Sequence, residues 1–108
     1  MRSRTAEDLY THDERFEVKS AGVSDFAYQV INRKLIGWAD YIIVMEDMHL
    51  KEIRKKFPDL YYKKRIRCLD IPDIYEYMEP SLQNEIRNKF EELYSRDIID
   101  YQRQMMNG

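Results

Sequence analysis

YIIVM, residues 41–45, is an unbroken apolar run made of aromatic, β-branched and flexible side chains. A strand that is covered on both faces of a parallel sheet carries apolar side chains at every position, whereas a half-exposed strand alternates apolar and polar ones. The run therefore predicts the central strand of a parallel sheet, with helices packed on both of its faces.

The chain after this run alternates between helix and strand. Residues 46–57 carry apolar side chains at helical spacing with basic ones between them, which predicts an amphipathic helix that Pro58 ends. The apolar face is expected to hold Met48, Ile53 and Phe57. Residues 65–69, RIRCL, predict a second strand after a tyrosine-bearing turn.

A long helix is expected to begin at Pro80, because proline is favoured in the first turn of a helix. The apolar residues that follow recur at i, i+4, i+8 and i+11, which places them on one stripe of a helix. They are Leu82, Ile86, Phe90 and Leu93.

The chain before the central run contributes two more helices and a short strand. The first twelve residues predict a helix that Ser3 could cap, and FEVKS at 16–20 alternates like a strand with one buried face. Ser24 and Asp25 are candidate caps for the next helix. Its apolar face is expected to hold Phe26, Val30, Ile31, Leu35, Ile36 and Trp38.

This order predicts one α/β domain over residues 1–108, folded as a three-layer sandwich around a short parallel sheet with right-handed crossovers. Three strands make a narrow sheet, and a helix that opens such a domain normally follows a strand. We therefore expect the sheet to lack its first strand. Such a sheet would expose apolar surface along the edge of residues 41–45, which would favour a homodimer.

Composition excludes several classes of protein. Hydrophobic residues make up 44% of the 108 and charged residues 35%, with three glycines, which indicates a globular chain. No run approaches the ~20 apolar residues of a membrane span, and no signal peptide is evident. We therefore expect a cytoplasmic protein without a membrane partner. The lone cysteine, Cys68, excludes an internal disulfide and a cysteine-based metal cluster.

Candidate chemistry lies in the loop that follows the second predicted strand, within KRIRCLDIPDIYEYMEP at 64–80. Loops at the carboxyl ends of buried strands commonly carry functional side chains in α/β proteins, because the sheet holds them in place. The candidates are Asp70, Asp73, Tyr75 and Tyr77. Each of them also has an ordinary role, since Asp is common in turns and Tyr often covers the edge of a core.

Four motifs occur together in an order that points to one family. They are RSRTAE at 2–7, SAGVS at 20–24, WADYIIVME at 38–46 and CLDIPDIY at 68–75. With these motifs the chain resembles the low-molecular-weight protein tyrosine phosphatase superfamily, and in particular its small bacterial and archaeal phosphatase-like branch, over roughly residues 2–93. The resemblance implies a four-stranded parallel sheet and a phosphate-binding loop, Cys-x5-Arg-Ser/Thr, at the start of the first helix.

The resemblance also assigns roles to residues of this chain. Arg2 matches the arginine that binds phosphate oxygens, and Ser3 matches the hydroxyl residue after it. Asp73 matches the general acid that protonates the leaving group, with Asp70 as the alternative, and Tyr75 matches an aromatic of the substrate cleft. The implied substrate is a phosphorylated protein or a small phosphate ester, and no cofactor or metal is implied.

The nucleophilic cysteine of this family has no counterpart here. It would lie six residues before Arg2, and the sequence begins one residue before Arg2. Cys68 does not replace it, because the sixth residue after it is Ile74 rather than arginine. We therefore expect a shortened phosphomonoesterase that is inactive by itself, since the thiolate is the group that attacks phosphorus.

Two other functions stay open. One is a non-catalytic interaction module derived from a phosphatase. The other is a nucleic-acid surface, because residues 51–67 hold eight Lys or Arg against two acids, with Tyr61 and Tyr62 among them. The net charge of −2 and the acidic loop that follows disfavour nucleic-acid binding. His49 and Glu52 lie three residues apart, but two possible ligands do not make a metal site.

Overall fold

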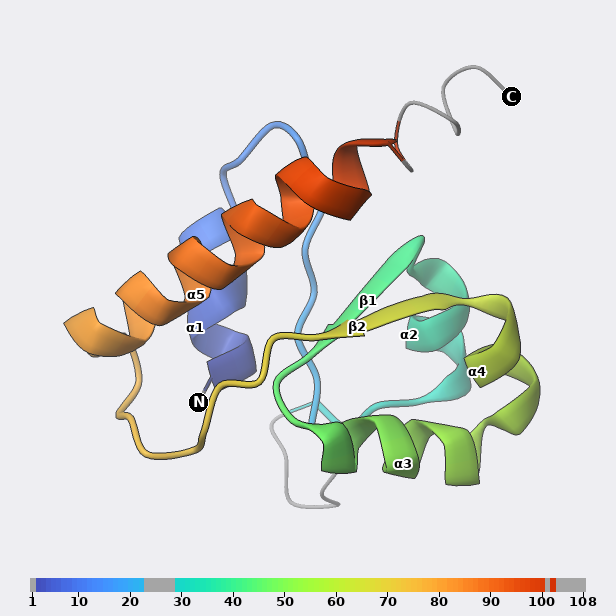
Figure 1. The fold of residues 1–108 in the computed structure, drawn as a ribbon. Helices are drawn as coiled ribbons and strands as arrows, with labels where there is room; N and C mark the ends of the chain where they lie inside the picture. The colour runs from blue at the N-terminus through green and yellow to red at the C-terminus, as the bar shows by residue number, and fades with distance from the viewer. Residues whose placement is uncertain (1, 23–28, 101, 103–108) are drawn as a thin grey trace.

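The computed structural model describes residues 2–22, 29–100 and 102, and it has a mixed α/β fold (Figure 1). Its elements in chain order are α1 (Arg2–Tyr10), α2 (Arg33–Trp38), β1 (Tyr41–Val44), α3 (Asp47–Lys56), α4 (Pro58–Lys63), β2 (Arg65–Cys68), α5 (Pro80–Leu93) and the π-helical segment η1 (Tyr94–Ile98). The tyrosine-bearing turn expected before β2 is the short helix α4, which Pro58 opens.

The sheet of the described residues consists of β1 and β2, which run parallel in a register from Tyr41 opposite Arg65 to Val44 opposite Cys68. Two further backbone hydrogen bonds extend the pairing beyond the strands. The Leu69 N–H donates to the Val44 carbonyl at 2.9 Å, and the Ile71 N–H donates to the Met45 carbonyl at 2.8 Å. The predicted parallel pair is therefore confirmed, and the loop after β2 is held against the end of β1.

Helices cover both faces of this sheet, as the apolar run of β1 predicts (Figure 1). Tyr41 and Ile43 pack against a cluster that α1 and α5 complete, whereas Ile42 and Val44 belong to a second cluster with Ile36 of α2. The two faces of β1 are thus buried in two separate apolar cores.

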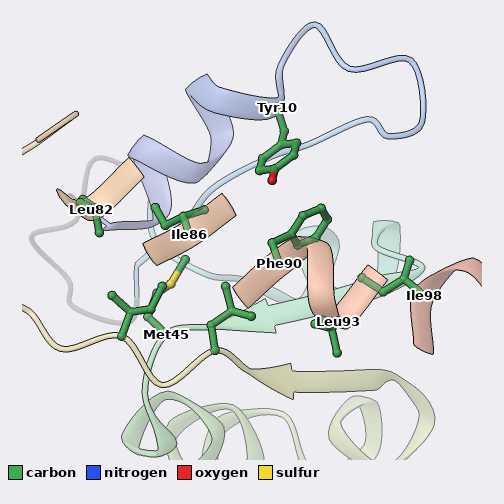
Figure 2. Packing of buried hydrophobic residues seen from close by; sticks show 9 residues of the cluster. Tyr10, Met45, Leu82, Ile86, Phe90, Leu93 and Ile98 are labelled. Carbon is green, nitrogen blue, oxygen red and sulfur yellow. The ribbon is translucent and has the colours of Figure 1, made fainter. Parts of the chain in front are cut away.

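The larger core lies between the sheet and the helices α1 and α5. Leu82 and Ile86 are fully buried, and Phe90 and Leu93 are nearly so, which confirms the stripe predicted for α5. Figure 2 shows Tyr10 of α1 facing Phe90 of α5, and their ring centroids lie 4.6 Å apart. Tyr10 is also tied to α5 by its hydroxyl, which donates to Glu91 at 3.3 Å.

The strand predicted at residues 16–20 is wrong. This segment is extended but belongs to no sheet of the described residues, and the nearest backbone pairing is an isolated bridge between Gly22 and Val30. Side chains hold it in place instead, because the ring of Phe16 packs edge-on against Phe90 at 5.2 Å and Tyr94 at 5.4 Å between centroids. A strand needs a neighbour at hydrogen-bonding distance, and a cavity separates this segment from β1.

The helix predicted before β1 is shorter than expected. Ser24, Asp25 and Phe26 lie outside the described residues, and Val30 and Ile31 precede the helix rather than belong to it. Asn32 caps α2, since its Oδ1 accepts a hydrogen bond from the Leu35 N–H at 2.9 Å.

Two other details of the predicted helices are corrected. Ser3 does not cap the first helix, because α1 already begins at Arg2 and Ser3 lies within its first turn. Met48 is 57% exposed, whereas Leu50 packs with Ile53 and Phe57 in the smaller core. The inward face of α3 thus follows the spacing i, i+3 and i+7 from Leu50. No helix in the described part of the chain is long and apolar enough to cross a membrane.

Replacing Ile86 by alanine tests whether α5 carries the larger core. Ile86 is 0% exposed, so Ile86→Ala removes buried methyl groups and leaves a cavity, which costs about 2–5 kcal/mol of unfolding free energy. The matched control is Ile74→Ala, because Ile74 is 74% exposed and its truncation costs less than about 0.5 kcal/mol. Urea denaturation measures both, and equal losses for the two variants would contradict this packing.

Candidate functional site

The first residue of α1 joins the helix to the carboxyl ends of both strands. Arg2 Nη1 donates a hydrogen bond to the Ile71 carbonyl at 2.7 Å, just after β2, and lies 3.1 Å from Glu46 Oε1, just after β1. The Arg2 side chain is only 10% exposed. A buried guanidinium therefore sits where an α/β fold commonly places functional groups, beside the amino end of a helix.

Asp73 completes this group from the loop after β2. Its Oδ1 lies 3.7 Å from Arg2 Nε, and its side chain is 66% exposed, against 30% for Glu46. Asp73 therefore makes the longer and more accessible of the two contacts. The structure thus brings together two candidate residues that are far apart in sequence, Arg2 in the first of the four motifs and Asp73 in the last.

His49, in the first turn of α3, joins the group of Arg2, Glu46 and Asp73 through its contact with Glu46. Its Nδ1 accepts a hydrogen bond from the Glu46 N–H at 3.2 Å. Burial lowers the pKa of His49 from the ordinary 6.5, and the Arg2 charge lowers it further, while Glu46 and Asp73 act in the opposite direction. His49 is thus neutral near pH 7, and its Nδ1 is hydrogen-bonded to the Glu46 backbone.

Glu46 and His49 were not among the site residues predicted from sequence. The signal that could have found them is the pattern Glu-x-x-His at the start of α3, which is a form of the capping box. That pattern predicts a local contact between the two residues. It says nothing of Arg2, which reaches Glu46 only through the packing of α1 on the strand ends.

Asp70, the alternative acid, lies in the turn just after β2. Its backbone is in the left-handed region with φ 56°, and its carbonyl accepts a hydrogen bond from Lys89 Nζ of α5 at 2.8 Å. Among the described residues, the acids that pair with Arg2 are Glu46 and Asp73. The geometry therefore favours Asp73 over Asp70 as the acid of an Arg2-centred site.

Cys68 lies on the opposite face of the sheet from α1. It packs against the smaller core with Ile53, and burial raises the pKa of its thiol. The Asp70 backbone N–H acts in the opposite direction, and the Asp47 carboxylate adds to the rise. A thiol whose pKa is raised is a poor nucleophile, because only the thiolate attacks. Its surroundings agree with a structural role.

The remaining candidates from the sequence are Ser3 of α1 and Tyr75 and Tyr77 of the loop after β2. Ser3 is half-buried in the first turn of α1, next to Arg2 in sequence. Tyr75 packs partly against the larger core. The hydroxyl of Tyr77 donates to Asp8, and this hydrogen bond raises the pKa of Tyr77. Tyr77 therefore fastens the loop to the outer side of α1 rather than to Arg2.

The arrangement suits the binding of an oxyanion. Arg2 supplies a planar fork of donors beside the N-terminal turn of α1, where the backbone N–H groups and the helix dipole favour negative charge. No group of three or more His, Cys, Asp or Glu side chains within the described residues could hold a metal ion.

No protein-family model, curated protein or solved structure matches this chain.

The pKa of His49 predicts how stability depends on pH. Because the pKa is lowered on folding, the unfolded chain takes up a proton at His49 before the folded chain does as the pH falls below 6.5. Stability is therefore retained above 6.5 and is lost as the pH falls towards the folded pKa. Protonation also breaks the hydrogen bond that Nδ1 accepts from Glu46.

Urea denaturation at about pH 7.5 and about pH 5.5 measures this effect, with His49→Gln as the comparison. The unfolding free energy of the unsubstituted chain should fall more between the two pH values than that of His49→Gln. Exposed His12 is common to both proteins and cancels in the difference. An equal fall in the two proteins would contradict the environment described for His49.

Proposed function

We propose that the Arg2 site binds the phosphoryl group of a phosphate monoester and that the chain is a phosphomonoesterase like those of the low-molecular-weight protein tyrosine phosphatase superfamily. The observation that carries this proposal is the buried guanidinium of Arg2 at the amino end of α1, with Asp73 3.7 Å away. Arg2 and Asp73 are the residues that match the family's phosphate ligand and general acid.

Binding would use groups that already lie together. A phosphate dianion would take two parallel hydrogen bonds from Arg2 and further ones from backbone N–H groups at the amino end of α1, with the Ser3 hydroxyl as an additional donor. Asp73 would then stand beside the ester oxygen that leaves, where a carboxylic acid can donate a proton to it. The proposal therefore gives Asp73 the leaving group and Arg2 the phosphoryl oxygens.

The two ion pairs of Arg2 differ in distance and burial, and this difference predicts which carboxylate a phosphate would displace. Glu46 is closer to Arg2, more buried and held by the first turn of α3, whereas Asp73 is 66% exposed and at 3.7 Å. A phosphate dianion competes with both carboxylates for the guanidinium. It should displace Asp73 and leave the Glu46 contact in place, because the looser contact costs less to break.

The covalent step of this chemistry needs a thiolate. Cys68 is the one cysteine of the sequence, and it lies on the other face of the sheet with a raised pKa. The proposal therefore gives these 108 residues the binding of the phosphoryl group and the protonation of the leaving group, and it requires the nucleophile from outside them.

A non-catalytic module is the second candidate, and one observation favours it. Arg2 already has three partners, Ile71, Glu46 and Asp73, so its charge is accounted for without a ligand. In that case Arg2 only fixes α1 to the strand ends. Titration with an oxyanion separates the two candidates, because a structural Arg2 binds none.

Titration with phenyl phosphate, followed by NMR or calorimetry, tests the proposal. The unsubstituted chain should bind it saturably, and Arg2→Lys should bind about tenfold more weakly, because a lysine cannot give two parallel hydrogen bonds. Asp73→Asn should bind more tightly, because it removes a competing negative charge. Arg2→Lys keeps the positive charge, so it also limits the loss of folding.

Arg33→Lys is the matched control for this titration. Arg33 is exposed and pairs with Asp59 on α4, away from the site, so its replacement should leave the affinity unchanged. Lack of saturable binding by the unsubstituted chain, or equal affinity of Arg2→Lys, would overturn the proposal in favour of the structural role.

A further inference from the structure

A cavity of about 550 Å³ separates β1 from the extended residues 16–22. All of residues 41–45 line one side of it, and residues 16–22 line the other. In Figure 1 the light-blue stretch after α1 descends in the same general direction as β1. The cavity is therefore a slot between two extended segments of similar direction.

The edge of β1 that faces this slot carries no strand among the described residues, because β2 occupies the other edge. The backbone groups of successive residues in a strand project to alternate edges. Since the Val44 carbonyl accepts from Leu69 of the β2 side, the N–H and carbonyl of Ile43 project towards the slot. The edge thus offers a donor and an acceptor to an incoming backbone.

The opposite wall offers backbone groups as well. The backbone hydrogen bonds of residues 16–22 to other described residues lie at the two ends of the segment, from the Phe16 N–H to Asp13 and at Gly22 with Gln29 and Ile31. Residues 17–21 between them make no backbone–backbone hydrogen bond within the described part of the chain, and of their carbonyls that of Ser20 accepts one from the Gln29 side chain at 3.0 Å. An extended backbone is the ligand that can hydrogen-bond to both walls at once, since a helix satisfies its own N–H groups.

The two faces of the slot are apolar. Tyr10, Ile86 and Phe90 close it on the side of α1 and α5, and Ile36 and Ile53 close it on the side of α2 and α3. A strand in this position would be covered on both faces, so it must carry apolar side chains at successive positions. Five residues of strand span about 17 Å, which is also the length of residues 41–45.

We propose that this slot binds an extended apolar segment of a partner polypeptide, which enters as a strand parallel to β1, between β1 and residues 16–22. Arg2, Ser3 and His49 line the slot together with Met45, the residue that follows β1. The carboxyl end of a parallel strand therefore arrives at the amino end of α1. Positive charge there favours the parallel direction over the antiparallel one, because the C-terminal carboxylate of the bound segment would then face Arg2.

Peptide binding tests this proposal without any phosphate compound, so its outcome is independent of the proposed function. The probe is a labelled peptide with two N-terminal lysines, five successive valine, isoleucine and leucine residues and a free carboxyl terminus. Fluorescence anisotropy measures its affinity for the full chain. A matched peptide with proline at the central position keeps the apolar character but lacks one N–H, and it should bind at least about tenfold more weakly.

Hydrogen exchange locates the bound peptide. Exchange of the Ile43 amide should slow at least about tenfold when the peptide is added. Val18→Glu, which places a charge in the slot, should weaken binding at least about tenfold, whereas Ile74→Glu on the exposed loop should not change it. Equal binding of the two peptides, or an Ile43 amide that does not respond, would overturn the proposal. Protection of Ile43 by self-association without peptide would overturn it too, because a second copy would then fill the slot.

Discussion

The buried guanidinium of Arg2 is the interaction on which the rest of the site depends. Burying a charge is costly unless it is paired and hydrogen-bonded, and Arg2 meets this condition through groups at the ends of both strands. The positions of α1, of Glu46 and of the loop at Ile71 are therefore coupled. Loss of the Glu46 carboxylate would leave the buried charge with the longer Asp73 contact, and the attachment of α1 to the strand ends would weaken.

The same interaction joins the two proposals. At the Arg2 end, an exposed Asp73 makes the looser contact, so an oxyanion can replace it without disturbing Glu46. At the other side, the slot along β1 opens towards Arg2, so a strand bound there would bring its carboxyl end to the same helix terminus. Both proposals thus rest on the positive amino end of α1, but one concerns a charged ligand and the other a backbone.

Sequence patterns predicted the parts of the fold that local physics determines. The apolar run of β1 and the stripe of α5 were confirmed, since burial on both faces and helical periodicity are visible in consecutive residues. The strand at 16–20 was wrong, because alternation does not guarantee a neighbour to pair with. The contact of Arg2 with Asp73 joins two residues that the sequence marked as candidates, whereas its contact with Glu46 arises only when α1 packs on the strand ends, which no local pattern encodes.

A crystal structure of this chain with tungstate, a tetrahedral oxyanion, tests the central claim most directly. The account predicts the ion within hydrogen-bonding distance of the Arg2 guanidinium and the first turn of α1, with Asp73 moved away from Arg2 Nε and Glu46 still in place. A structure in which Arg2 keeps both carboxylates, and tungstate is absent or bound elsewhere, would contradict it.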